Sequence, residues 1–404
     1  MSPPNTRSLP RLLYIGDVPV ENTYHGSLQL FRLLETYPKE RLLIMEAGNS
    51  LSAPARRIEG VPYLERQSKL SRLRITRFAE PYFLAKMHLA ALRAELLLAD
   101  ARRFRPEAIL TVSHEVAWLS AAAIARRLGV PLHLVCHDEW GLEGWGARGT
   151  GAFKDRLFGH HYRAAASRLC ISPEMASDNE SRFCVPGDVL YPCRSRSAPR
   201  VQPATPRPGS DTDIVCGYAG SIASGGLIHA LDLMAQALEP IGGTLRIFGP
   251  FTAEHGRSRG ISRRNIEFVG HADPLIPTLR EKVDLLYLPM SFADEDRANM
   301  RICFPSKLAD YTLAGLPIVI MGPDYSSAAQ WTLSNPDAAK LLTHPDVAAL
   351  REAVTTVAGD PALRLRLSAA ALADGERYFS HAAAFEKLSQ VLSRARLAQS
   401  RVAA

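Results

Sequence analysis

The sequence FPSKLADYTLAGLPIVI, residues 304 to 320, predicts a loop, a helix and a buried strand in succession. Pro305 suits the first turn of a helix, because it has no backbone N–H to leave unpaired there and its φ is already helical. Gly315 and Pro317 end that helix, and the apolar β-branched run 318–320 is typical of a strand inside a parallel sheet. The stretch therefore favours an α/β fold.

The start of the same stretch carries a candidate anion site. Ser306 and Lys307 stand in the first turn of the predicted helix, where unpaired backbone N–H groups and the positive end of the helix dipole favour an anion. Lys307 adds a full positive charge. Asp310 lies four residues after Ser306 and so projects from the same face, about one turn further on. We expect a phosphate here; the alternative is an ordinary surface helix leading into a core strand.

The same alternation of strands and helices fills the rest of the chain. In the first half we expect helices at 26–37, 81–104 and 115–128, and strands at 12–16, 41–45, 108–112 and 132–136. In the second half we expect a helix from about Gly226, and strands within 213–221, 244–250, 265–271 and 283–289. Strand, glycine-bearing loop and helix in this order predict Rossmann-like units with parallel sheets. The first loop lacks the G-x-G-x-x-G pattern of dinucleotide-binding proteins.

A change in composition marks the boundary between two domains. Residues 192–212 are rich in Pro, Ser and Arg and poor in apolar residues, which is typical of an interdomain linker. We therefore expect an N-terminal domain at 1–191 and a second domain at 213–380, followed by a last helix within 381–404. Two such α/β domains predict facing Rossmann-like halves with a cleft between them.

Length and composition agree with two globular domains. The chain has 404 residues, 47% of them apolar and 22% charged. No apolar run approaches the eighteen or so residues that span a bilayer, and the first residues lack the apolar core of a signal peptide. These features predict a cytoplasmic protein. The six cysteines form no C-x-x-C pair and are expected to be buried free thiols rather than metal ligands or disulfides.

Positive charge is concentrated in the first half of the chain. Residues 1–200 hold 28 Lys and Arg against 20 Asp and Glu, a net +8, whereas the remaining residues have 20 against 21, a net −1. Within residues 56–105 there are twelve basic and five acidic side chains, and Arg72, Arg74 and Arg77 alternate with apolar residues. Such a segment favours peripheral contact with an anionic membrane or a phosphorylated acceptor. The alternative is a solvated, Arg-rich helix face. We expect no nucleic-acid partner.

The stretch 304–320 resembles the donor-site signature P-S-K-L-x-E-Y-x-x-x-G-x-P-V-V of glycosyltransferase family 4, whose members have the two-domain GT-B architecture. The resemblance implies transfer of a sugar, with retention, from a nucleoside diphosphate sugar to a glycan or lipid-linked acceptor. It implies no metal and no other cofactor. In the second domain, Asp310 would bind the donor ribose, and the diphosphate would be held by Ser306, Lys307, Gly220 and Ser221. The last helix, 381–404, would cross back to the first domain.

In the first domain the resemblance points to two places. His137 and Asp138 match the V-x-H-D-like end of a strand whose histidine touches the transferred sugar, so they are the predicted catalytic residues. The alternative is a structural histidine whose hydrogen bonds are satisfied within the protein. An imidazole there could hydrogen-bond a sugar hydroxyl or stabilise charge between the sugar and the leaving phosphate. The second place matches the glycine loop that approaches the donor phosphate or the acceptor, and it comprises Asn22, Tyr24, His25 and Gly26.

The sequence departs from the family pattern at two positions. No Arg or Lys follows the Gly220 loop, where the family usually has a basic pair that clamps the diphosphate, and the first acid of the family's pair falls on Ile302. Two other functions therefore stay open: a GT-B sugar-nucleotide epimerase, and a catalytically silent GT-B scaffold in a glycan-assembly complex. The acidic run 294–296 could mimic the D-x-D metal motif of GT-A enzymes, but a doubled Rossmann layout argues against a metal site.

Overall fold

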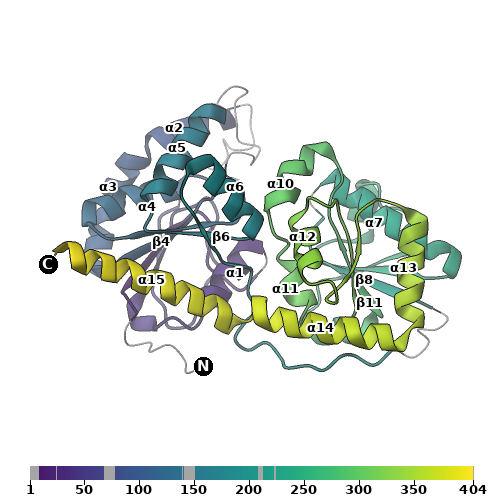
Figure 1. Cartoon of the computed structure of the whole chain (residues 1–404). Coiled ribbons are helices and arrows are strands. Elements are labelled where there is room, and N and C mark those ends of the chain that lie inside the picture. The colour runs from purple at the N-terminus through teal and green to yellow at the C-terminus, as the bar shows by residue number, and fades with distance from the viewer. Residues whose placement is uncertain are drawn as a thin grey trace. The chain divides into compact units, whose positions relative to one another are not determined.

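The computed structural model describes residues 9–23, 25–67, 78–138, 140, 151–207, 213–222 and 224–403, without the side chains of residues 25, 79, 80 and 396–403. The chain forms two compact units (Figure 1). Unit 1 comprises Met1–Arg196 together with His381–Ala404, and unit 2 comprises Ser197–Ser380. In the described residues no helix is both long and apolar enough to cross a membrane.

Unit 1 is built on a parallel sheet whose described strands lie in the order β3-β2-β1-β4-β5-β6-β7. These are β1 (Leu12–Gly16), β2 (Leu42–Glu46), β3 (Tyr63–Glu65), β4 (Ala108–Val112), β5 (Leu132–Cys136), β6 (Ser167–Cys170) and β7 (Asp188–Val189). The strands β1, β2, β4 and β5 are buried throughout, as expected for apolar runs in a parallel sheet. The strand order reverses between β1 and β4, the place where doubly wound sheets collect ligands.

Helices cover both faces of this sheet. One face packs on α1 (His25–Leu34) and α15 (His381–Ala403), and the other packs on α3 (Ala90–Phe104) and α4 (Ala117–Leu128) (Figure 1). The remaining helices of unit 1 are α2 (Ala79–His88), α5 (Gly151–Ala164) and α6 (Pro173–Phe183). The prediction of one continuous helix at 81–104 is wrong, because this stretch forms the two helices α2 and α3. The chain is divided at Leu89, where ψ is −1°, and α2 and α3 bury separate sets of side chains on the two sides of that break.

Unit 2 has a parallel sheet with the described strands in the order β10-β9-β8-β11-β12-β13. Its strands are β8 (Val215–Ala219), β9 (Thr244–Phe248), β10 (Ile266–Gly270), β11 (Leu285–Pro289), β12 (Ile318–Met321) and β13 (Lys340–Leu342). Its helices are α7 (Gly225–Leu238), α8 (Ala253–Ser258), α9 (Leu275–Lys282), α10 (Arg297–Ile302), α11 (Lys307–Tyr311), α12 (Ser327–Ser334), α13 (Val347–Gly359) and α14 (Pro361–Phe379). Apolar side chains of α7, α13 and α14 pack on one face of the sheet. Both units are thus doubly wound and Rossmann-like.

The Pro-rich segment between the units is held at both ends by hydrogen bonds. The backbone N–H of Cys193 donates to Gln29 Oε1 at 2.9 Å within unit 1. In unit 2 the N–H of Ala204 donates to the Gly315 carbonyl at 2.7 Å, and Arg207 pairs with the buried Asp284 at 3.2 Å. Residues 208–212 lie outside the described part. The chain at 193 and at 204–207 therefore belongs to the surface of a unit and is not a free tether.

Candidate functional site

Two groups predicted from distant parts of the sequence, Gly220 and Lys307, lie against each other. Gly220 follows β8 directly, and Lys307 begins α11. A Cβ at position 220 would lie 2.0 Å from Cε of Lys307 and 3.1 Å from its Nζ. The φ of Gly220 is +145°, a conformation that other residues rarely adopt. Position 220 therefore favours glycine for its backbone, and a Cβ there would displace the lysine side chain that crosses it.

Two tyrosines hold this contact in place. The backbone N–H of Ala219 donates to the Tyr311 hydroxyl oxygen at 2.7 Å, which ties the end of β8 to α11. The Tyr218 hydroxyl donates to the Ser221 carbonyl at 2.5 Å, and its ring centre lies 5.3 Å from Lys307 Nζ. Burial raises the pKa of Tyr311, so its hydroxyl stays neutral. The loop 219–221 is thus fixed to the rigid elements on either side.

Lys307 is a cation without a carboxylate partner in the part of the chain that the structure describes. Burial lowers its pKa from 10.5 to about 8. The aromatic face of Tyr218 compensates in part, since a ring attracts a nearby cation. A desolvated ammonium gains most from an anion that binds beside it. The arrangement can therefore receive a phosphate.

The helix that carries Lys307 is shorter than the sequence predicts. We expected Pro305 and Ser306 in its first turn and an end near Gly315, but α11 covers only Lys307–Tyr311. The chain then continues in turns, because the N–H groups of Leu313 and Ala314 bond three residues back. So short a helix has a weak dipole. Any anion affinity here rests on the Lys307 charge, and Ser306 precedes α11 without a side-chain bond to it.

Asp310 stands on α11, three residues after Lys307, and is partly buried. Its charge raises the pKa of the adjacent Tyr311, after the larger effect of burial. Lysine and aspartate thus share a short rigid element that is anchored to the end of β8.

The glycines that follow β8 serve different purposes. Gly225, at the start of α7, has open space where a Cβ would project. A Cβ at Gly226 would lie 1.8 Å from Ser291 Oγ and 3.0 Å from Asp296 Oδ2. Asp296 belongs to the acidic run 294–296, which forms a 3₁₀ helix. Among the described residues, the N-terminus of α7 is therefore packed by the chain itself beside Gly226 and open beside Gly225.

Arg259 is a basic residue near the Gly220 loop that was not predicted from the sequence. It follows α8, and its guanidinium NH1 donates to the Ile222 carbonyl at 3.0 Å, two residues beyond Gly220. Residue 259 is otherwise exposed, so other guanidinium N–H groups remain available to a ligand. No linear motif marks it, because only the fold brings the end of α8 to this loop. Arg259 therefore brings one positive charge to the loop that follows β8.

In unit 1, the predicted His137 and Gly26 also come together. A Cβ at Gly26, in the first turn of α1, would lie 3.7 Å from His137 Nδ1. Burial lowers the pKa of His137, and the neighbouring His114 lowers it further against the opposing effect of Asp138. The imidazole is therefore neutral at pH 7 and can donate one hydrogen bond and accept another. Asp138 itself is exposed.

The other residues predicted for the first loop are not gathered at His137 by any described contact. Asn22 is exposed, and its backbone N–H donates to the Arg56 carbonyl at 2.9 Å. Tyr24 and the side chain of His25 lie outside the described residues.

A buried polar network at the β1/β4 switch point was not foreseen from the sequence. Asp17 accepts hydrogen bonds from the N–H groups of Val116 at 2.8 Å and Ala117 at 2.5 Å, so it caps α4. Glu115 accepts from Lys86 at 3.2 Å and has a left-handed φ of +41°. Burial raises the pKa of Asp17, and Glu115 raises it further. These groups tie the ends of β1 and β4 to the helices α2 and α4.

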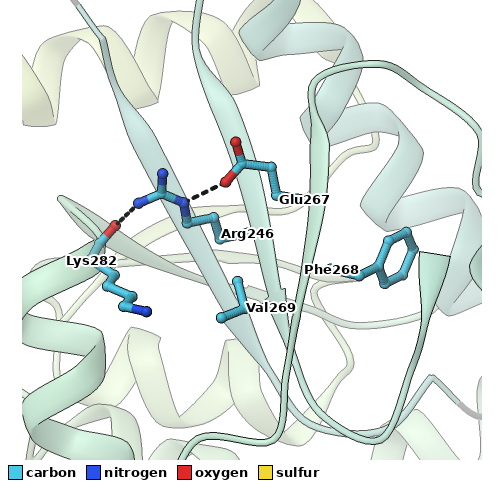
Figure 2. A pocket seen from close by; sticks show the side chains of 5 residues that line it. All are labelled: Arg246, Glu267, Phe268, Val269 and Lys282. Atoms are coloured by element: carbon cyan, nitrogen blue, oxygen red, sulfur yellow. Dashed lines mark hydrogen bonds and ion pairs between the residues drawn. The ribbon is translucent and has the colours of Figure 1, made fainter.

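A separate hollow lies at the edge of unit 2, between β9, β10 and α9 (Figure 2). Arg246 Nε donates to Glu267 Oε2 at 2.7 Å, and its NH1 donates to the Lys282 carbonyl at 2.7 Å. The Nε and NH1 groups of Arg246 therefore already donate hydrogen bonds within the protein. None of the residues that line the hollow is among the site residues predicted from the sequence. Within the described ranges, no group of three or more His, Cys, Asp or Glu side chains could hold a metal ion.

The sequence matches no protein-family model and no curated protein, but its structure resembles solved ones along nearly its whole length. HepE of Anabaena, in complex with UDP and glucose, superposes with a TM-score of 0.64 at 15% identity, over 95% of this chain and 99% of that one. The lipopolysaccharide outer core galactosyltransferase WaaB gives 0.63 at 15% identity, over 95% and 99%. Sucrose-phosphate synthase of Thermosynechococcus elongatus gives 0.64 at 13% identity, over 96% and 99%.

These likenesses define the class of the fold. The chain has the GT-B fold of glycosyltransferases, with two Rossmann-like units, as expected from the sequence. At such low identities the likeness establishes the fold alone.

Proposed function

We propose that the protein is a glycosyltransferase that moves a sugar from a nucleoside diphosphate sugar to a glycan or lipid-linked acceptor. The observation that carries the proposal is the contact of Lys307 with Gly220 at the end of β8. In a GT-B fold, a desolvated cation beside a glycine loop at the carboxyl end of a strand is suited to a diphosphate.

Unit 2 would bind the donor. Lys307 would neutralise the diphosphate, helped by the free N–H groups of Arg259, while the Gly220 and Ser221 loop lets phosphate oxygens approach the backbone. Asp310 would accept hydrogen bonds from the ribose hydroxyls, and Ser306 would add a hydroxyl donor. Because HepE was solved with UDP, UDP is the first nucleotide to test.

Unit 1 would act on the sugar and the acceptor. A neutral His137 would donate a hydrogen bond to a sugar hydroxyl or to the oxygen on which charge develops, with Asp138 beside it. Gly26 lets the start of α1 come close to that imidazole, and Asn22, Tyr24 and His25 would contribute acceptor contacts.

We propose retention of the anomeric configuration, without a metal or other cofactor, because the donor-site signature resembles that of family 4. The bond between the anomeric carbon and the phosphate oxygen breaks, and the acceptor oxygen bonds to the same face of that carbon. The departing phosphate takes the acceptor proton, so no protein base is needed. Positioning and electrostatic stabilisation of the leaving group then provide the catalysis.

Turnover of nucleotide sugars tests this proposal. The parent protein is incubated with UDP-sugars and other nucleoside diphosphate sugars, with and without candidate glycan acceptors, and nucleotide release and products are measured in the presence of a metal chelator. We expect release that Lys307→Ala reduces by roughly a hundredfold and that Lys340→Ala, at an exposed lysine of β13, leaves unchanged. NMR of the product reports the anomeric configuration.

Each alternative has its own outcome in this experiment. A changed sugar in the absence of any acceptor would identify a sugar-nucleotide epimerase and overturn the transferase proposal. Binding of nucleotide without release from any donor, even by slow hydrolysis, would identify a silent scaffold.

A further inference from the structure

The outer side of α3 exposes a row of large apolar side chains. Leu89, Leu92 and Leu96 are exposed to 52%, 64% and 79%. Their spacing of three and four residues places them on one face of the helical segment. Exposed Ala99 extends the row toward the end of α3, and exposed Ala85 lies on α2, four residues before Leu89. Among the described residues, each of these three leucines keeps more than half of its surface exposed.

Two exposed aromatic residues accompany this row. Phe78 precedes α2, and Phe153 lies on α5, where its ring centre is 6.2 Å from that of His88 at the end of α2. We call Phe78, Leu89, Leu92, Leu96 and Phe153 the α3 apolar face. In the described part of the chain, large exposed apolar side chains otherwise occur only at Leu333 and Leu365 in unit 2. The three leucines share one helix face and Phe153 lies beside His88, next to Leu89. Such a grouping of exposed apolar side chains indicates an interaction surface.

Basic side chains lie at one end of the apolar row. Arg102, Arg103 and Arg105 are exposed at the end of α3, where they make no ion pair among the described residues.

The acidic side chains of α3 are already neutralised. Glu95 pairs with Arg127 of α4, and Asp100 pairs with Arg66 at 2.5 Å. The basic run Lys69, Arg72, Arg74 and Arg77, which leads into α2 in the sequence, lies outside the described residues. Among the described residues, the end of α3 therefore carries excess positive charge.

We propose that unit 1 docks on an anionic bilayer through the α3 apolar face. Leucines and phenylalanines that enter the headgroup–acyl boundary remove apolar surface from water, while arginines at the same depth meet lipid phosphates. A second copy of the chain fits less well, because pairing two such faces would bring like charges together. The long arginine side chains can also spread along the boundary with their charge in the polar layer.

The helix that extends this face also contacts the strand ends of unit 1. On α2, Phe83 lies 6.2 Å from Trp140 between ring centres, and Lys86 bonds Glu115 at 3.2 Å. Trp140 follows β5 three residues after His137. Resting on the proposed function, docking would bring an acceptor anchored in the same bilayer to the unit that carries His137. The docking itself does not depend on the activity.

Vesicle co-sedimentation tests the surface with the full chain. Large vesicles of phosphatidylcholine alone and of equal parts phosphatidylcholine and phosphatidylglycerol are compared at low ionic strength. We expect binding to the anionic vesicles only, weakened by salt. Leu92→Glu/Leu96→Glu should lower the partition coefficient roughly tenfold or more. The matched control is Leu333→Glu/Leu365→Glu, which changes leucines of similar exposure, 58% and 59%, in unit 2 and should bind as the parent does.

A second variant, Arg102→Glu/Arg103→Glu, should weaken binding to anionic vesicles with the leucines intact. Circular dichroism confirms folding, which substitutions at such exposed positions should preserve. The proposal is overturned if the parent does not bind anionic vesicles, or if Leu92→Glu/Leu96→Glu binds them as well as the parent does. It is also overturned if the control Leu333→Glu/Leu365→Glu loses as much vesicle binding as Leu92→Glu/Leu96→Glu. Light scattering that shows a dimer, broken by the leucine variant and unaffected by vesicles, would assign the face to a second copy instead.

Discussion

Lys307 lies across the α-carbon of Gly220, so closely that a Cβ at position 220 would be 2.0 Å from the lysine Cε. This contact joins the end of β8 to the start of α11, which are distant in sequence. It places a cation whose pKa is lowered to about 8 beside the one loop of unit 2 that follows the first strand. The donor-site proposal depends on this relationship more than on any other.

Gly220→Ala should damage both stability and nucleotide binding. The new methyl group would meet Lys307 and force a left-handed φ on alanine, at a cost of about 2 kcal/mol in the free energy of unfolding. Displacing the lysine should also weaken nucleoside diphosphate binding at least tenfold. Chemical denaturation and calorimetry measure the two effects. Gly225→Ala is the matched control, since a Cβ there meets nothing within 4 Å. If Gly220→Ala and Gly225→Ala have the same stability and the same nucleotide affinity, the contact between Gly220 and Lys307 is contradicted.

Nucleotide affinity should depend on pH through Lys307. Its pKa is lowered to about 8 in the folded protein, so the ammonium loses its proton above that pH. A bound phosphate favours the charged form and raises the pKa again, so affinity should fall by up to tenfold per pH unit above about 8 and binding should take up a proton. Calorimetry in buffers of different ionisation enthalpy measures this uptake. Lys307→Arg keeps its charge at these pH values and should abolish the pH dependence of nucleotide affinity. If Lys307→Arg shows the same pH dependence as the parent, the dependence does not come from Lys307.

The same pKa predicts a stability effect in the absence of nucleotide. Because the unfolded chain binds the Lys307 proton more tightly than the folded chain, stability should rise as pH increases from about 8 toward 10.5 relative to Lys307→Met. Urea unfolding of both proteins across this range isolates the contribution. An identical pH dependence for the two would show that the lysine is not desolvated.

Tyr311→Phe should loosen the glycine loop. The Ala219 N–H would lose its partner at 2.7 Å in a buried place, which costs about 1–3 kcal/mol. Denaturation should show this loss, and hydrogen exchange at Ala219 should accelerate. Tyr325→Phe is a control outside this contact. Unchanged exchange at Ala219 would mean that the tyrosine does not anchor the loop.

His137→Ala should separate catalysis from donor affinity. We expect turnover to fall roughly a hundredfold while nucleotide affinity, set in unit 2, changes less than twofold. The lowered pKa of His137 keeps the imidazole neutral, so the parent rate should show no His137 step near pH 6.5. His160→Ala, at an exposed histidine of α5, serves as the control. A large loss of nucleotide affinity in His137→Ala would contradict this division of roles.

Much of the fold could be predicted because its strands are apolar runs between turn signals. The strands expected at 12–16, 108–112 and 132–136 coincide with β1, β4 and β5. The edge strand β3 was not foreseen, since Tyr63–Glu65 is three residues long and not fully buried. The break at Leu89 was missed because α2 and α3 read as one continuous helical pattern.

The candidate site could be predicted only where a local motif marks it. Gly220 and Lys307 were both expected at the diphosphate, and the fold brings them into contact. Arg259 carries no signal in its neighbourhood, and Asp17 becomes a cap of α4 only through tertiary structure. The length of α11 also depends on its surroundings, because the turns after Tyr311 satisfy the backbone without a regular helix.

Donor recognition by Asp310 can be tested at the level of single hydroxyl groups. If its carboxylate accepts from the ribose, the parent should bind a dideoxyribose analogue of the nucleoside diphosphate at least tenfold more weakly than the ribose form. Asp310→Ala should bind both forms equally. If Asp310→Ala still binds the ribose form more tightly than the dideoxyribose form, residues other than Asp310 contact the ribose hydroxyls.

The most direct measurement is calorimetric titration of the parent and Lys307→Ala with UDP and the other common nucleoside diphosphates, with Lys340→Ala as control. We expect at least one nucleotide to bind the parent and the control equally, and Lys307→Ala to bind it at least tenfold more weakly. The assignment of the donor site to unit 2 is contradicted if no nucleoside diphosphate binds the parent, or if Lys307→Ala binds as tightly as the parent does.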